Sequence, residues 1–180
     1  MRKKIMKALS VMLAVVLTFT AAPLSGFVGL ELPEWLDFSI KSSAATSGTC
    51  GKNLTWTFDE SIDTLTISGT GAMEDFLFGV PWESYDDKIR KVVINNGVTT
   101  IGDYAFEDCV NLYDVTLPNS VITIGDRVFD YCLNLKRIII PNNVTLIGYG
   151  AFNDCRNLTS VIIGDNVTTI GDNAFDGEFE

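Results

Sequence analysis

The sequence predicts a β-rich α/β repeat solenoid: a right-handed coil with a parallel sheet on one face, short helical turns elsewhere and an N-terminal β-hairpin cap. Two observations predict it. Residues 89–180 fall into four 23-residue segments that align without a gap, and a stretch of alternating apolar and polar residues precedes them. One such unit cannot bury its own apolar face, so neighbouring units are expected to stack. We therefore expect a leader at 1–45, a cap segment at 46–88, and repeats at 89–111, 112–134, 135–157 and 158–180.

Residues 1–45 are typical of a secretory signal peptide and leader. A basic start with Arg2 is followed by an apolar stretch from Ala8 to Ala22, which is the pattern of an export signal. The small residues Ser43 and Ala45 suit a cleavage site. An uncleaved anchor from Ala8 to about Leu30 is the alternative, and either interpretation predicts a secreted or cell-surface protein.

The charge excludes several classes of function. The chain carries a formal charge of −10 and has no histidine. An acidic protein is a poor partner for nucleic acid, whose phosphates need a basic footprint. The lack of histidine removes serine–histidine and cysteine–histidine nucleophile pairs and the commonest metal ligand. Beyond position 45 the balance is 8 basic to 20 acidic residues, a formal charge of −12.

The segment 46–88 is expected to form a β-hairpin that covers the first coil. Its apolar residues alternate with polar ones, first Leu54, Trp56 and Phe58 and then Leu65 and Ile67, which favours two paired strands. A proline at position 81 is expected to begin a short helix or turn. Terminal units of repeat arrays need such a cover. An independent binding domain is the alternative, which is difficult for a segment of this size.

Each repeat is expected to contain two extended stretches and one helical turn. In the second unit Leu112, Val115 and Leu117 should point inward, and a second apolar stretch should follow the turn at Pro118. Glycine ends that stretch in every unit, in the column Gly102, Gly125, Gly148 and Gly171. The next residue is aspartate in three units, Asp103, Asp126 and Asp172. We expect these carboxylates to cap the helical turns. The alternative is that the column of aspartates binds calcium ions, but Tyr149 interrupts the column.

Units of the form L-x-x-I-x-I-P-x-x-V-T-x-I-G-x-x-A-F-x-x-C-x-N resemble the BspA-type leucine-rich repeat, over residues 89–180. The resemblance implies a leucine-rich-repeat coil in a bacterial secreted or surface protein, and some members of the family are implicated in binding host proteins or cells. The sequence departs from the pattern at Val128, Tyr149 and Glu178.

The four cysteines are Cys50, Cys109, Cys132 and Cys155, and the last three occupy one column of adjacent repeats. Their spacing does not fit a zinc site, and no histidine could complete one. We interpret them as small buried apolar side chains. A disulfide between neighbouring coils is the alternative, and it would leave the third cysteine of the column unpaired.

The outward positions of the first strand in each repeat form the candidate binding surface. They are Arg90, Lys91, Val93, Tyr113, Asp114, Thr116, Lys136, Arg137, Ile139, Thr159, Ser160 and Ile162. Half of the 8 basic residues after position 45 lie at these positions. Beside them runs a strip of mostly β-branched residues, Val93, Thr116, Ile139 and Ile162. A partner-binding face is one interpretation; strand propensity with charges that block aggregation is the other.

The sequence therefore predicts a non-enzymatic, adhesion-like binding module for a protein or cell-surface ligand. We expect no cofactor, no metal and no nucleic-acid partner, and membrane contact only through the N-terminal segment. The alternative function is a structural spacer, or a fragment of a longer repeat array, with no ligand of its own. A hydrolase has only scattered carboxylates in its favour.

Overall fold

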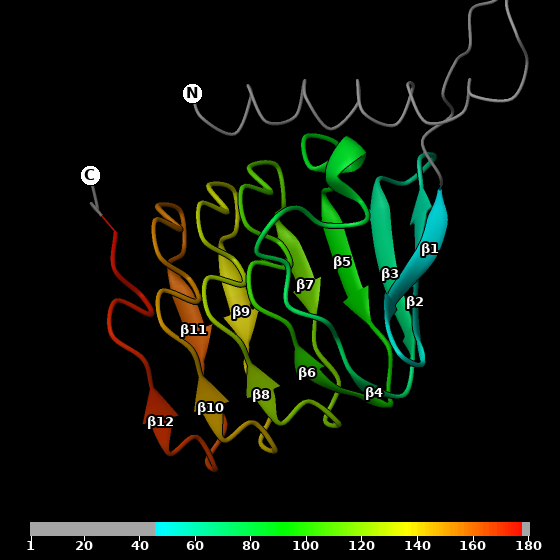
Figure 1. Cartoon of the computed structure of the whole chain (residues 1–180). Coiled ribbons are helices and arrows are strands. Elements are labelled where there is room, and N and C mark those ends of the chain that lie inside the picture. The colour runs from blue at the N-terminus through cyan, green and yellow to red at the C-terminus, as the bar shows by residue number, and fades with distance from the viewer. Residues whose placement is uncertain (1–45, 178–180) are drawn as a thin grey trace, which may run out of the picture. The chain divides into compact units, whose positions relative to one another are not determined.

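The computed structural model describes residues 46–177, in which the repeats stack as successive coils (Figure 1). Each repeat contributes two short strands, one to each of two rows. The first row holds β5 (Lys91–Ile94), β7 (Asp114–Thr116), β9 (Arg137–Ile139) and β11 (Ser160–Ile162). The second row holds β6 (Val98–Ile101), β8 (Thr123–Ile124), β10 (Leu146–Ile147) and β12 (Thr169–Ile170). All pairing between repeats is parallel, which confirms the predicted parallel-sheet solenoid.

The register follows the repeat length. Lys91 pairs with Asp114, and Leu146 pairs with Thr169, each 23 residues apart. The prediction placed a parallel sheet on one face only, and here it is incomplete. The second extended stretch of each repeat also pairs from coil to coil, so the solenoid has two rows of parallel strands.

The segment before the repeats extends both rows. β1 (Ser47–Gly51), β2 (Leu54–Asp59) and β3 (Thr64–Gly69) are antiparallel neighbours, and β3 pairs in parallel with β5. β4 (Gly71–Ala72) pairs in parallel with β6. Along β2 the side chains alternate between buried and exposed, as the apolar pattern predicts.

The predicted helical turns are absent from residues 46–177, where the one helix is the 3-10 helix η1 (Glu83–Tyr85) ahead of the repeats. In the repeats, backbone N–H groups that a helix would use internally are donated to the next coil. Phe106 N–H donates to the Val128 carbonyl and Phe129 N–H to the Ala151 carbonyl, both at 2.8 Å. Left-handed residues such as Tyr104 (φ 61°) also interrupt any helical run. The α/β character of the prediction is therefore wrong.

The aspartate column has a different role from the predicted helix capping. Asp103 Oδ1 accepts a hydrogen bond from the N–H of Asp126, and Asp126 Oδ1 accepts one from the N–H of Tyr149, both at 2.8 Å. Each carboxylate thus ties its own coil to the following one. The glycine column allows this close approach: a Cβ at Gly125 would collide with the Asp103 carboxylate and the Ile101 carbonyl.

Aromatic rings form the centre of the core. The indole of Trp82 begins a stack that continues with the phenylalanine of each repeat, at centroid distances of 5.6, 5.3, 5.2 and 5.1 Å, through Phe106, Phe129, Phe152 and Phe175. Trp82 Nε1 also donates to the Ala105 carbonyl at 3.1 Å, so its one polar atom is satisfied inside the core. The stack joins the segment before the repeats to the repeats themselves.

Candidate protein-binding surface

The first strand row brings the predicted surface residues together. The pairing places Lys91 beside Asp114 and Val93 beside Thr116 on one side of the row, and Arg137 beside Ser160 and Ile139 beside Ile162 on the other. β7 and β9 lie next to each other between these pairs (Figure 1). None of the twelve predicted residues is buried. We call this set the strand face.

The positive charge of the strand face is less uniform than the sequence suggests. Arg90 forms an ion pair with Asp63 at 3.1 Å, and Lys91 forms one with Asp114 at 2.8 Å. The hydrogen bond to Asp114 raises the pKa of Lys91 above its usual value. Lys136 and Arg137, in contrast, are exposed and have no carboxylate within ion-pairing distance among residues 46–177. The available positive charge therefore lies at one end of β9.

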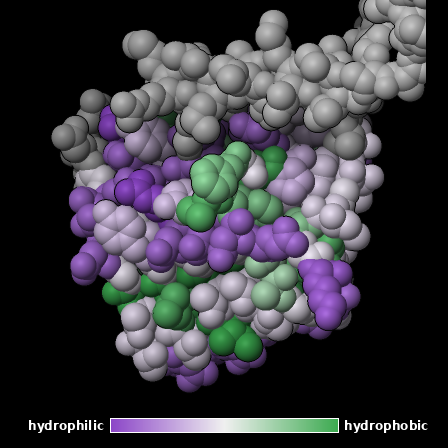
Figure 2. Space-filling view, in the orientation of Figure 1, coloured by the Kyte–Doolittle hydropathy of each residue, from purple (hydrophilic) through white to green (hydrophobic). Residues whose placement is uncertain are grey.

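Exposed apolar side chains lie beside these two cations. Ile139 and Ile162 are 48% and 47% exposed, whereas Val93, at the equivalent position of β5, is half-buried. In the view of Figure 2, hydrophilic and hydrophobic residues alternate over the visible surface instead of forming one continuous apolar area. The mixed chemistry of Lys136, Arg137, Ile139 and Ile162 is thus a small local feature, which suits recognition of a partner that offers both acidic and apolar groups.

The cysteines lie inside the core, as interpreted from the sequence, and none of the four forms a disulfide. The Cys132 thiol donates to the Phe106 carbonyl at 3.3 Å, and the Cys155 thiol donates to the Phe129 carbonyl at 3.1 Å. Burial raises the pKa of the Cys155 thiol to about 12 and also raises that of Cys132. These thiols stay protonated at neutral pH and are poor nucleophiles.

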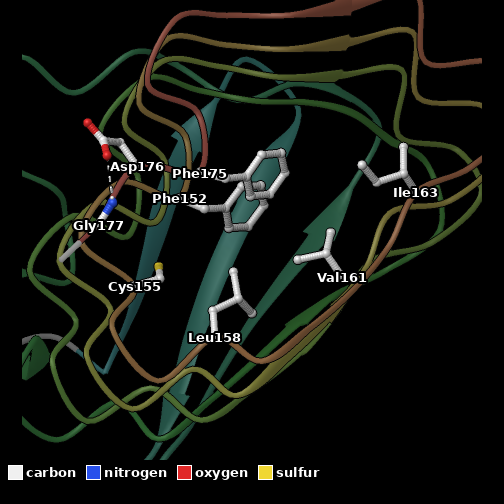
Figure 3. A pocket seen from close by; sticks show the side chains of 8 residues that line it. All are labelled: Phe152, Cys155, Leu158, Val161, Ile163, Phe175, Asp176 and Gly177. Carbon is white, nitrogen blue, oxygen red and sulfur yellow. Dashed lines mark hydrogen bonds between the residues drawn. The ribbon is translucent and has the colours of Figure 1, made fainter. Parts of the chain in front are cut away.

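Two exposed apolar features were missed by the sequence reasoning. Phe78, in the loop before η1, is 93% exposed. At the last repeat, a hollow of about 160 Å³ opens between the stacked rings of Phe152 and Phe175 and the side chains of Leu158, Val161 and Ile163 (Figure 3). The residues that line the hollow occupy core positions of the repeat pattern. Only the place of their repeat in the stack distinguishes them from buried residues at the same positions of other repeats.

Within residues 46–177, no three acidic, cysteine or histidine side chains are grouped so that they could hold a metal ion. The same residues contain no helix with the length and apolar character that crossing a bilayer requires.

The family of the chain is shown by the match of its repeats to a known repeat family. Residues 84–179 match the family described as "BspA type Leucine rich repeat region (6 copies)". The chain belongs to the BspA-type leucine-rich repeat family. A search of curated proteins found no significant match.

Several solved structures share the fold of this BspA-type protein. A leucine-rich repeat protein from Eubacterium ventriosum is 28% identical, with a TM-score of 0.52, over 70% of this chain and 40% of that one. The T. pallidum leucine-rich repeat protein is 22% identical, with a TM-score of 0.54, over 71% of this chain and 66% of that one. The pneumococcal vaccine antigen PcpA is 27% identical, with a TM-score of 0.50, over 64% of this chain and 28% of that one. The chain thus spans less than half of the first and last of these proteins.

Proposed function

We propose that this BspA-type repeat protein is an exported, non-enzymatic binding module whose strand face contacts a protein or cell-surface ligand. The observation that carries the proposal is that Lys136 and Arg137, which have no ion-pair partner among residues 46–177, lie beside exposed Ile139 on β9. The remaining strand-face residues would frame this centre. The buried, protonated cysteines offer no nucleophile, which supports a binding function over catalysis.

The size of the strand face limits the affinity of a single module. Four strands spaced by about 4.8 Å, with about six residues each at about 3.3 Å per residue, cover roughly 400 Å². A standard stable interface buries about 800 Å² on each partner. We therefore infer weak binding by one module, strengthened where several modules act together.

Export is proposed from the N-terminal sequence. The basic start and the apolar stretch from Ala8 to Ala22 favour a signal peptide, with the uncleaved anchor as the alternative. These residues lie outside the described part of the chain. The description of the structural neighbour PcpA as a vaccine antigen agrees with an extracellular address.

The segment 46–88 is proposed to close the first coil. Its strands β3 and β4 continue the two rows at that end, and Trp56, Trp82 and Tyr85 are buried beside the first repeat. Such a cover removes the free strand edge and the apolar end that an uncapped coil would expose.

One observation favours the alternative of a structural spacer. The ion pairs Arg90–Asp63 and Lys91–Asp114 satisfy half of the cations of the strand face within the molecule. Charges used in this way protect a strand surface from aggregation and need no external partner.

A matched pair of double variants tests the binding function. Lys136→Ser with Arg137→Ser removes the two cations beside Ile139, and Arg90→Ser with Lys91→Ser removes the same charge from the two ion pairs. In pull-downs from host-surface protein extracts, the first variant should lose most of the captured protein, and the second should lose little. Capture should also weaken as salt increases.

Two results would count against this site. Equal capture by the parent protein and the Lys136/Arg137 variant would exclude the proposed centre. An absence of specific capture by the parent protein would favour the spacer. Circular dichroism of each variant provides the control for folding.

A further inference from the structure

The loop between β4 and η1 carries two exposed apolar side chains at its tip. Leu77 is 66% exposed, and Phe78, at 93%, is the most exposed of the large apolar residues of the described chain. Gly79 follows with a φ of 123°, which glycine adopts without strain, and bends the chain directly after Phe78. Phe76 and Trp82, on either side of the tip, are buried with their rings edge to face at a centroid distance of 5.4 Å. The tip therefore protrudes between two anchored ends.

The backbone of this tip is not tied to the strands or the coils. Before it, the N–H of Phe76 donates to the Asp103 carbonyl at 2.9 Å. After it, the N–H of Glu83 donates to the Val80 carbonyl at 3.0 Å. Among residues 46–177, no backbone hydrogen bond joins residues 77–79 to a strand or to a repeat. The tip can therefore take up the extended form in which a protease binds its substrate without opening the core.

The other exposed aromatic side chains of the described residues lie on the coils. Tyr113, Tyr131 and Tyr149 are 54%, 40% and 40% exposed. Tyr113 and Tyr131 each donate their backbone N–H to a carbonyl of a neighbouring coil at 3.0 Å. The N–H of Tyr149 donates to the Asp126 carboxylate at 2.8 Å. A protease would have to separate two coils to bind the backbone at these tyrosines, which it need not do at the loop tip.

We propose that the loop tip is a cleavage site for an endopeptidase that accepts an aromatic residue before the scissile bond. The ring of Phe78 would fill the apolar pocket that sets this specificity. Hydrolysis breaks the peptide bond between Phe78 and Gly79. Water supplies the hydroxyl group to the Phe78 carbonyl carbon and the proton to the Gly79 nitrogen, which leaves a carboxylate and an amine. The inference goes beyond the proposed binding function and does not depend on the strand face.

The two pieces of the cut chain should stay together. The first piece contains β1 to β4, and the second contains η1 and the repeats. β3 pairs with β5 and β4 pairs with β6 across the cut. Trp82 of the second piece contacts the rings of Trp56 and Phe76 of the first, at centroid distances of 6.0 and 5.4 Å. Cleavage should therefore divide the segment 46–88 without removing it from the first coil.

Brief digestion of the full chain with chymotrypsin tests the cleavage site. New chain ends are mapped by mass spectrometry and scored within residues 46–177, where the first cut should follow Phe78. Phe78→Ser should slow cleavage of the loop several-fold, and the neighbouring variant Leu77→Ser should leave the rate nearly unchanged. A first cut after one of the three exposed tyrosines, no cut within the loop, or a Phe78→Ser variant that is cut there at the parent rate would overturn the proposal.

Size-exclusion chromatography and urea unfolding of the cut protein test whether the pieces stay together. Both pieces should elute in one peak at the volume of the intact protein. The urea midpoint of the cut protein should rise with protein concentration, because its unfolding separates two chains, whereas that of the intact protein should not change. Separate elution of the pieces, or a midpoint of the cut protein that is independent of concentration, would contradict the retained assembly.

Discussion

At the scale of single residues, the aromatic stack explains why one phenylalanine occurs in every repeat. Phe129 lies between Phe106 and Phe152, with centroids at 5.3 and 5.2 Å, and none of its surface is exposed. Phe175 has the ring of Phe152 on one side, and it lines the hollow at the last repeat. The same residue type at the same repeat position therefore has two different packing environments.

Alanine substitutions at these two positions should destabilise the protein unequally. Phe129→Ala leaves a closed cavity and should lower the free energy of unfolding by about 3–5 kcal/mol. Phe175→Ala should cost less than half of that, because its ring is only partly covered. Urea unfolding followed by tryptophan fluorescence measures both. Equal losses would show that the stack does not have a covered centre and an open end.

At the scale of elements, the turn after the glycine column holds the coils together without forming a helix. Its N–H groups and the aspartate carboxylates bond to the following coil. Asparagines add a similar link on the other side of the turn: Asn134 Nδ2 donates to the Val110 carbonyl at 2.8 Å. These turns thus act as a third set of connections between coils, beside the two strand rows.

The hydrogen bonds of the aspartate column predict that the stability lost on substitution depends on the position of the repeat in the stack. Asp126→Ala removes the acceptor for the Tyr149 N–H and should lower the free energy of unfolding by about 1–2 kcal/mol. Asp172→Ala, in the last coil, should change it by less than about 0.5 kcal/mol, because no described residue donates to that carboxylate. Thermal or urea unfolding of the two variants checks this. A larger loss of unfolding free energy from Asp172→Ala than from Asp126→Ala would contradict this role of the aspartates.

Much of this architecture could be predicted from the repeats, because a column of identical residues shows which positions must be interior. The period placed Val115 and Phe129 correctly, and the strand-face residues lie on the outside. The helical turns were wrong because an aspartate two residues before an apolar pair, as in Asp103 before Ala105 and Phe106, fits a helix cap as well as a hydrogen bond to the next coil. The ion pair of Arg90 with Asp63 could not be predicted, since it joins segments outside the repeat register.

At the scale of the whole described unit, exposed apolar side chains occur at several separate places, including the loop of Phe78, the strand face and the last repeat. On the strand face, the exposed isoleucines lie beside Lys136 and Arg137, which have no ion-pair partner among residues 46–177. We therefore propose that a ligand binds at the strand face.

Lysine labelling with and without a captured ligand tests the central claim most directly. Lys136 is exposed on the strand face at one end of β9, whereas exposed Lys52 lies in the turn between β1 and β2 and serves as the internal control. With an amine-reactive reagent and peptide mass spectrometry, we expect the bound ligand to lower the labelling rate of Lys136 several-fold and to leave that of Lys52 unchanged. A Lys136 that labels at the same rate in the free and bound protein would contradict it.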